Sequence, residues 1–252
     1  MAARLSLTTA VLAALALTAT GCGPAASSSS TPTALPTITA SPVPTQSPTQ
    51  SPELAVCNKL VTRARPGREL ISSAQSEFPM ALALEVPAGW KGCGLFFNEA
   101  PGGLMMVGMW KVGFVYPDPC HWKQTLATRP ATGSAAEIAQ GFADQDGTDA
   151  TPVEQSSIDG YSAWHLRISV RSDMDGTQCE PDTGVPEFRF MQGDGDSVWW
   201  LDARDAPTLV ADVWALDVDG AAFVIQTVRW SENSAALVAE QAAMVESIDF
   251  NP

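Results

Sequence analysis

The chain contains two histidines, His121 and His165, and neither stands in a recognisable catalytic pattern. His121 lies between Cys120 and Trp122, where we expect it to pack against a disulfide. His165 alternates with apolar residues, which places it on the wetter face of a strand. A nucleophilic triad needs an imidazole beside a nucleophile and a carboxylate, and no spacing here indicates one. The Gly-x-Ser-x-Gly elbow, the P-loop and the dinucleotide fingerprint are also missing. We therefore expect no catalytic residue.

Two acidic pairs, Asp173 with Asp175 and Asp194 with Asp196, stand beside glycines as calcium-loop residues do. Neither pair has the further ligands and the distal Glu of an EF-hand. Asp and Gly also favour turns, and turn residues are the interpretation that we prefer. We expect no metal and no cofactor; calcium is the alternative, which a titration of the melting temperature would test.

Tryptophan is frequent, at 8 residues, and Trp199 and Trp200 are adjacent. Neighbouring side chains on a strand point to opposite faces, so both are buried only if both faces of the sheet are covered. Core packing is the interpretation that we favour. The alternative is that one of them forms an exposed platform for a sugar ring or for the apolar patch of a partner. Trp199, Trp200 and His165 are therefore the candidate binding residues.

The N-terminus has the layout of an export signal. Arg4 precedes an apolar run over residues 5–17, which is too short to span a bilayer as a stable helix. Small residues and then Cys22 follow, and this order resembles the lipobox of bacterial lipoproteins. The resemblance implies that Cys22 is lipidated and becomes the first residue of the mature protein, with the several acyl chains that a stable anchor needs. An ordinary secretory signal cut elsewhere and an uncleaved anchor are the alternatives.

We predict three parts: a lipoprotein signal peptide over 1–21, the lipidated cysteine with a disordered tether over 22–54, and one folded extracytoplasmic domain over 55–252. The tether consists almost entirely of Ser, Thr, Pro, Ala and Gln, which cannot bury enough surface to offset the entropy of ordering. The net charge of −14 argues against binding nucleic acid through a basic field. The anchor would place the domain at the outer face of the cytoplasmic membrane.

Four further cysteines, Cys57, Cys93, Cys120 and Cys179, predict two disulfides in an exported domain. Sequence alone leaves three connectivities open. We favour Cys120–Cys179, which joins two loop cysteines flanking the central part of the chain, and Cys57–Cys93, which would pin the start of the domain to its first strands. The lack of a Cys-x-x-Cys pair argues against zinc.

Most of the domain has the patterns of strands joined by tight turns. Asp-Gly pairs supply the positive φ angles that hairpin turns demand, and they separate residues 153–158 from 161–170 and residues 213–218 from 221–228. The remaining apolar runs predict strands over 81–86, 95–97, 104–116, 187–191 and 197–201, with a hairpin at Pro101-Gly102-Gly103 and a polar loop over 171–186.

Two helices complete the prediction. Ser134 with Glu137 three residues later fits a capping box, and this helix should end near Asp146-Gly147. The second helix covers about 234–247. One stripe of this helix should lie on the sheet, and it consists of Leu237, Gln241, Met244, Val245 and Ile248. The fold class is α+β, a mostly antiparallel sheet with helices packed on it.

Several short segments share their order and composition with known proteins. They are Pro-Ala-Gly-Trp at 87–90, Asp-Pro-Cys-His-Trp at 118–122, the Asp159-Gly160 hairpin, the loop residue Cys179, Leu-Asp-Val-Asp-Gly at 216–220 and the final Glu-Ser-Ile-Asp-Phe at 246–250. This layout resembles a group of actinobacterial lipoproteins of unknown function, and its order of elements is similar to the PsbP-like and LpqN-like α/β/α sandwich. The resemblance implies a Cys120–Cys179 disulfide and brings no catalytic residue.

These observations predict a membrane-anchored extracytoplasmic binding or interaction module. Its partners would be the membrane, through Cys22, and an unknown small molecule, wall component or protein. A cell-wall-associated hydrolase without a recognised motif is one alternative. An accessory subunit of a membrane complex, by analogy with PsbP-like proteins, is another.

Overall fold

The structure is a computed structural model, and it describes residues 55–56, 67–71, 80–125, 133–182, 184–193, 198–218 and 220–252. The predicted signal peptide, Cys22, the whole of the predicted tether and Cys57 lie outside these residues, as does the side chain of Cys93. No helix in the described ranges is long and apolar enough to cross a membrane.

Strands make up most of the described chain. They are β1 (Ala55–Val56), β2 (Gly67–Ile71), β3 (Leu82–Val86), β4 (Lys91–Cys93), β5 (Leu95–Ala100), β6 (Gly103–Val115), β7 (Thr148–Ala150), β8 (Glu154–Ile158), β9 (Tyr161–Val170), β10 (Pro181–Asp182), β11 (Val185–Gly193), β12 (Val198–Asp202), β13 (Leu209–Val218) and β14 (Ala221–Trp230). The helices are α1 (Trp122–Thr125), α2 (Ala135–Ala143) and α3 (Ala235–Glu246), with 3₁₀ turns η2 (Gly176–Gln178) and η3 (Ala206–Thr208).

An 11-stranded sheet forms the centre of the domain, and β1, β2 and β3 form a separate 3-stranded sheet. The order along the large sheet is β10-β11-β6-β14-β13-β9-β7, with β12 on β11, β5 on β6, β4 on β5 and β8 on β9. Its described pairings are antiparallel. The predicted mostly antiparallel α+β fold is therefore confirmed.

The three predicted hairpins are confirmed, and each has residues with positive φ in its turn. Asp159 and Gly160 have φ of 47° and 79° and join β8 to β9. Gly220 has a φ of 79° in the turn from β13 to β14. Gly102 and Gly103 have φ of 96° and 115° where β5 turns into β6.

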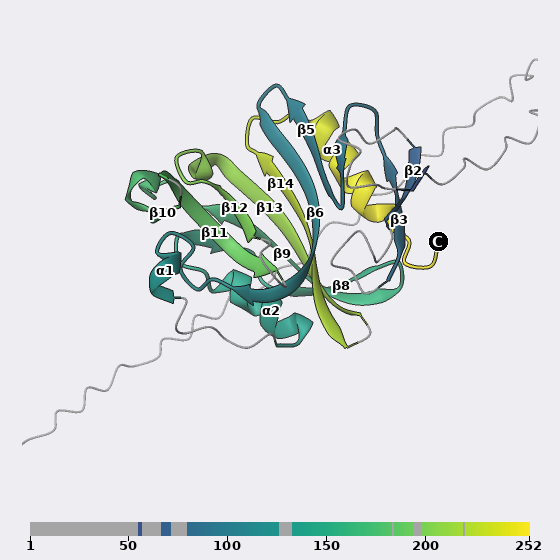
Figure 1. The fold of residues 1–252 in the computed structure, drawn as a ribbon, viewed down its shortest axis with the longest axis horizontal. Coiled ribbons are helices and arrows are strands. Elements are labelled where there is room, and N and C mark those ends of the chain that lie inside the picture. Colours follow the sequence, from purple (N-terminus) through teal and green to yellow (C-terminus); the bar gives the residue numbers. More distant parts are fainter. Residues whose placement is uncertain are drawn as a thin grey trace, which may run out of the picture. The chain divides into compact units, whose positions relative to one another are not determined.

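Strand β6 is the longest, with 13 residues, and it is shared between neighbours. One edge pairs with β14 over Met106–Lys111. The other edge pairs with β5 from Gly103 to Gly108 and with β11 from Val112 to Val115. Figure 1 shows the bend of β6 that makes this change of partner possible.

The central strands carry one apolar set on each face, and a helix packs on each set (Figure 1). On β13, Ala211 and Val213 belong to the cluster around α2, whereas Leu216 and Val218 belong to the cluster around α3. We call these the α2-side core and the α3-side core. Alternation along a strand explains why neighbouring residues enter different cores.

Both predicted helices are present. Ser134 and Glu137 form the predicted capping box at the start of α2, and Ser234 caps α3. Helix α2 ends at Ala143, earlier than predicted. Gln145 leaves the helical path because its buried amide donates hydrogen bonds to the carbonyls of Tyr116 and Phe190, each at 2.8 Å. In α3, Gln241, Met244 and Val245 are buried as the predicted stripe requires.

The Cys120–Cys179 disulfide is formed, and both cysteines are buried. The polar loop predicted over 171–186 is shorter than expected, because η2 and β10 interrupt it and β11 begins at Val185. The Cys57–Cys93 pair stays a prediction.

Candidate functional site

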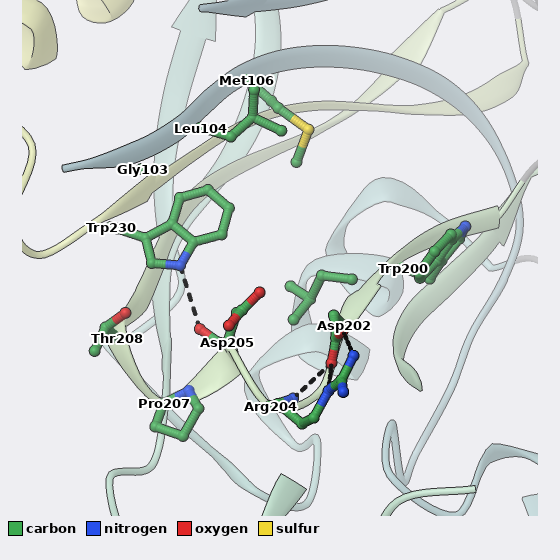
Figure 2. Close-up of a pocket in the computed structure, with 11 residues that line it drawn as sticks. Gly103, Leu104, Met106, Trp200, Asp202, Arg204, Asp205, Pro207, Thr208 and Trp230 are labelled. Atoms are coloured by element: carbon green, nitrogen blue, oxygen red, sulfur yellow. Dashed lines mark hydrogen bonds and ion pairs between the residues drawn. The ribbon is translucent and has the colours of Figure 1, made fainter. Parts of the chain in front are cut away.

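A cavity of about 700 Å³ lies where the start of β6 and the end of β14 face β12 and the segment that leads to η3 (Figure 2). Leu104, Met106 and Trp230 line it from the β6–β14 side. Trp200 and Leu201 line it from β12. A volume of this size is within the usual range for small-molecule sites.

Trp200 is 46% exposed, whereas Trp199 is 2% exposed. The expectation that core packing buries both indoles is therefore wrong for Trp200. Among the described strands, β12 pairs with β11 alone. Helix α2 covers one face of this pair: Trp199 contacts Phe142 of α2 and stacks on Phe190. The opposite face carries Trp200, with Arg189 directly across on β11.

Trp230 is held in place at the opposite wall of the cavity. Its indole Nε1 donates a hydrogen bond to the carbonyl of Asp205 at 3.2 Å. Its backbone N–H donates to Asn233 Oδ1 at 2.7 Å, and the Asn233 amide donates in turn to the carbonyl of Gly103. A Cβ atom on Gly103 would lie 3.0 Å from the indole, so the glycine allows the ring to rest against the backbone. Trp230 is therefore held in place on the wall of the cavity across from Trp200.

The rim of the cavity is polar. Arg204 and Asp202 form an ion pair there, with Nε donating to Oδ1 at 2.8 Å. The hydrogen bond from Arg204 lowers the pKa of Asp202 below its ordinary value. Asp205 and Thr208 also line the cavity. Apolar walls with a charged and hydroxylated rim suit a ligand that has both apolar faces and hydroxyl groups.

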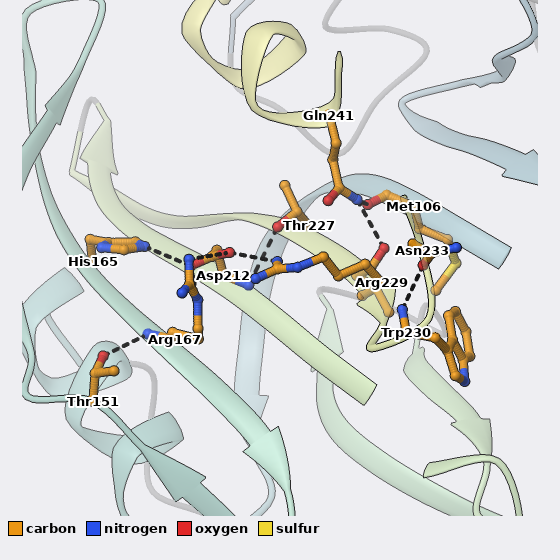
Figure 3. A network of polar contacts seen from close by, with 11 residues as sticks. Met106, Thr151, His165, Arg167, Asp212, Thr227, Arg229, Trp230, Asn233 and Gln241 are labelled. Atoms are coloured by element: carbon orange, nitrogen blue, oxygen red, sulfur yellow. Dashed lines mark hydrogen bonds and ion pairs between the residues drawn. The ribbon is translucent and has the colours of Figure 1, made fainter. Parts of the chain in front are cut away.

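His165 lies in a different environment, a polar network centred on Asp212 (Figure 3). His165 Nε2 is 3.3 Å from Asp212 Oδ1. Arg167 donates to both carboxylate oxygens, at 2.9 and 3.3 Å, and Arg229 donates to Oδ2 at 2.7 Å. Burial raises the pKa of Asp212, but the hydrogen bonds from His165, Arg167 and Arg229 outweigh burial and hold the pKa well below its usual value.

This network is built to hold a carboxylate rather than to activate a nucleophile. The ring of His165 stacks on Trp214 with centroids 4.7 Å apart, and its polar partner is an ionised carboxylate that two arginines already neutralise. Trp214 also lines a smaller cavity of about 360 Å³ against α3. Neither this cavity nor the one beside Trp200 is lined by a histidine.

His121 lies in the turn that contains Cys120 of the disulfide, and its ring contacts Asp118 in the same turn. Its Nδ1 lies 2.8 Å from Asp118 Oδ2. The other oxygen of Asp118 accepts hydrogen bonds from the backbone N–H groups of Cys120 and His121, both at 3.0 Å.

The acidic pairs behave as turn residues where the structure describes them. Asp175 accepts a hydrogen bond from the Thr177 N–H at the start of η2, and Asp173 pairs with Arg171. Asp194 and Asp196 lie outside the described residues. Within the part of the chain that is described, no group of three or more His, Cys, Asp or Glu could hold a metal ion.

The structure does not bring the three candidate binding residues together. Trp200 lines the larger cavity, Trp199 is buried in the α2-side core, and His165 stacks on a residue that packs against the α3-side core. Sequence reasoning missed Trp230, which forms the second wall. The signal available was its position two residues beyond Val228, the last residue of the predicted strand, where alternation places its side chain on the same face as that of Val228.

No family model and no curated protein sequence matches this chain. Among solved structures it is similar to the crystal structure of LpqN, involved in cell envelope biogenesis of Mycobacterium tuberculosis, at 12% identity and a TM-score of 0.36 over 73% of this chain and 91% of that chain. It is also similar to the solution structure of cyanobacterial PsbP (CyanoP) from Synechocystis sp. PCC 6803, at 12% identity and a TM-score of 0.37 over 74% and 94%.

A third similar structure comes from Bacteroides thetaiotaomicron VPI-5482, at 12% identity and a TM-score of 0.29 over 75% of this chain and 50% of that chain. LpqN and a PsbP protein are thus the two kinds of protein that the sequence resembles. No function is transferred at these identities and TM-scores, and the function proposed below rests on the residues of this chain.

Proposed function

We propose that this protein is a membrane-anchored extracytoplasmic binding module that holds a saccharide between Trp200 and Trp230. The observation that carries the proposal is the half-exposed indole of Trp200, which lines a cavity of about 700 Å³ across from Trp230. The apolar C–H faces of a sugar ring stack well on indole rings, which combine an apolar body with a polar edge. Hydroxyl groups at the ring edge would meet the polar rim that Asp202, Arg204 and Asp205 provide.

Binding is favoured over hydrolysis. A glycosidase needs a carboxylic acid with a raised pKa and a second carboxylate on the other side of the scissile bond. The pKa of Asp202 is lowered by Arg204 instead, which disqualifies it as the acid. A concave site of this volume also suits a small ligand better than the flat patch expected of a protein interface.

The location is part of the proposal and rests on Cys22. A lipid on this cysteine and the tether up to residue 54 would hold the domain at the outer face of the cytoplasmic membrane. Substituting Cys22→Ser should then move the protein from the membrane fraction to the soluble fraction. A variant that stays with the membrane would refute the lipid anchor.

The site is tested by titrating the full chain, purified in detergent, with two tetrasaccharides, cellotetraose and the tetramer of N-acetylglucosamine. Trp200→Ala and Trp230→Ala should each weaken binding at least about tenfold, equivalent to about 1.4 kcal/mol. Trp214→Ala is the matched control, because this indole lines the other cavity. If neither sugar binds the wild-type protein by calorimetry, the proposed function is wrong.

A further inference from the structure

The two aspartates that line the cavity between Trp200 and Trp230 differ in how their charges are compensated. Asp202 is paired with Arg204, which donates hydrogen bonds to both of its carboxylate oxygens. The pKa of Arg204 is raised chiefly by these bonds to Asp202 and only then by the charge of Asp205. Among the described residues, none donates a hydrogen bond to the Asp205 carboxylate or forms an ion pair with it. Asp205 therefore supplies the uncompensated charge of this cavity.

The local sequence explains why this carboxylate has no partner in its own turn. Asp205 occupies the N-cap position of η3, where an Asp side chain ordinarily accepts a hydrogen bond from the second or third backbone N–H of the turn. Asp175 does so at the start of η2, through the N–H of Thr177. The second residue of η3 is Pro207, which has no N–H, and Asp205 makes no capping hydrogen bond. The carboxylate thus remains available to the cavity.

The carboxylate of Asp205 lies between the aromatic walls. Figure 2 shows it projecting into the space between Trp230 and Trp200, whereas the carboxylate of Asp202 is turned toward Arg204. The backbone of Asp205 is tied to one of these walls, since its carbonyl accepts the hydrogen bond from Trp230 Nε1 at 3.2 Å. The charge is therefore held beside the surface on which a sugar ring would stack.

A negative charge between indole rings favours a ligand with a positively charged group. A protonated amine gains from a charge-assisted hydrogen bond to the carboxylate and from an indole face within about 6 Å. Arg204 opposes it little, because its own charge is paired with Asp202. The net charge of the chain, −14, attracts cations toward the site as well. A sugar with a carboxylate or a phosphate group would be repelled.

We infer that the saccharide in this cavity is an amino sugar with a free, protonated amine, which binds the carboxylate of Asp205. The inference rests on the proposed function and adds its substrate class. It makes Asp205 the residue that determines specificity, whereas Trp200 and Trp230 provide the stacking surfaces that any sugar ring would use.

The test compares the tetramer of glucosamine with its N-acetylated counterpart and with cellotetraose. Titrations of the full chain in detergent are made at about pH 5.5, where Asp side chains are ionised and the sugar amines are protonated. The three sugars share their ring and linkage and differ in one substituent of each ring. We expect the glucosamine tetramer to bind at least about fivefold more tightly than either neutral sugar. Asp205→Asn should abolish this preference and leave the affinity for the neutral sugars unchanged.

Asp149→Asn is the matched control. Asp149 is an exposed carboxylate of β7 that does not line the cavity, so this variant removes the same charge from the protein and should leave the preference intact. A preference that both variants lose to the same extent would reflect the net charge of the chain alone, and it would overturn the inference.

Equal affinity for the three sugars, tighter binding of a neutral sugar, or a preference that survives Asp205→Asn also overturns the inference. In each case the proposed function stands as long as a neutral sugar binds and Trp200→Ala weakens that binding. If neither neutral sugar binds, the proposed function is wrong and the inference falls with it, because the attraction of a polyamine to an acidic protein needs no saccharide site.

Discussion

Gln226 and Gln241 are buried glutamines on opposite sides of the β6–β14 pair, and of their two side-chain amides only that of Gln241 is hydrogen-bonded. Gln241 Nε2 donates to the carbonyls of Met106 at 2.7 Å and Val228 at 2.9 Å. Gln226, between Val224 and Val228 on the same face of β14, has no partner for either amide atom. Two residues of one type at similar depth thus differ in hydrogen bonding: the Gln241 amide joins α3 to the sheet, and the Gln226 amide is buried without a partner.

This contrast gives opposite expectations for stability. Gln241→Leu should lower the free energy of unfolding by about 2 kcal/mol, because it removes two hydrogen bonds and leaves two carbonyls without these donors. Gln226→Leu should leave the stability unchanged or raise it by up to about 1 kcal/mol, because leucine has no amide to desolvate. Urea unfolding of both variants measures the difference. A Gln226→Leu variant that is as unstable as Gln241→Leu would show that the Gln226 amide is hydrogen-bonded in the folded protein.

The adjacent indoles Trp199 and Trp200 should also respond differently to truncation. Trp199→Ala removes a buried ring that stacks on Phe190 with centroids 4.3 Å apart and should cost about 3–5 kcal/mol. Trp200→Ala removes a ring that is 46% exposed and should cost less than about 1 kcal/mol. Chemical unfolding of the two variants under the same conditions checks this. Similar losses for both would contradict the exposure of Trp200 and with it the binding wall.

Much of the fold was predictable because its signals are local. The Asp159-Gly160 turn and the Ser134–Glu137 capping box depend on residues that are close in sequence, and both are confirmed. The sharing of β6 between β5 and β11 was not predictable, since it depends on a bend in a long strand and on partners far along the chain. The early end of α2 was missed for the same reason, because Gln145 bonds to distant carbonyls.

The site was only partly predictable. Because Trp199 and Trp200 are neighbours on a strand, their side chains must point to opposite faces of the sheet. Which indole is exposed depends on the pairing with β11, where Arg189 lies opposite Trp200 and Met191 lies opposite Trp199. Outside the site, Gln226 was detectable in principle, as an amide on a strand whose same-face neighbours are the apolar residues Val224 and Val228. That it has no partner is a property of the packed core and cannot be read from one strand.

Asp212 should make stability depend on pH. Its pKa in the folded protein lies well below the ordinary value because His165, Arg167 and Arg229 outweigh the effect of burial. Its contribution to stability is therefore complete at neutral pH and declines as the pH falls below about 4, the range where the carboxyl of the unfolded chain takes up a proton. Asp212→Asn should lower the free energy of unfolding by about 3 kcal/mol at pH 7, because it leaves two arginines without their partner.

The difference between the wild type and Asp212→Asn should shrink as the pH is lowered from 4 toward 2, as urea unfolding over this range would measure. Asp202→Asn is the matched control: its carboxylate also pairs with an arginine, but at the surface, where solvent weakens the interaction. We expect a much smaller loss for this variant at neutral pH. A loss for Asp212→Asn that is the same at pH 7 and pH 2 would mean that the carboxylate charge does not stabilise the fold.

The Cys120–Cys179 disulfide should account for a large part of the stability of the domain. It closes a loop with a sequence separation of 59 residues, and the loss of chain entropy in the unfolded state for a loop of this length corresponds to about 4 kcal/mol. The double variant Cys120→Ser, Cys179→Ser should therefore show a large decrease in the free energy of unfolding. Peptide mapping of the wild type without reductant should recover the two cysteines in one linked pair, and the same experiment tests the predicted Cys57–Cys93 link. Recovery of Cys120 linked to Cys57 or Cys93 would contradict the pairing, and a double variant as stable as the wild type would contradict its energetic role.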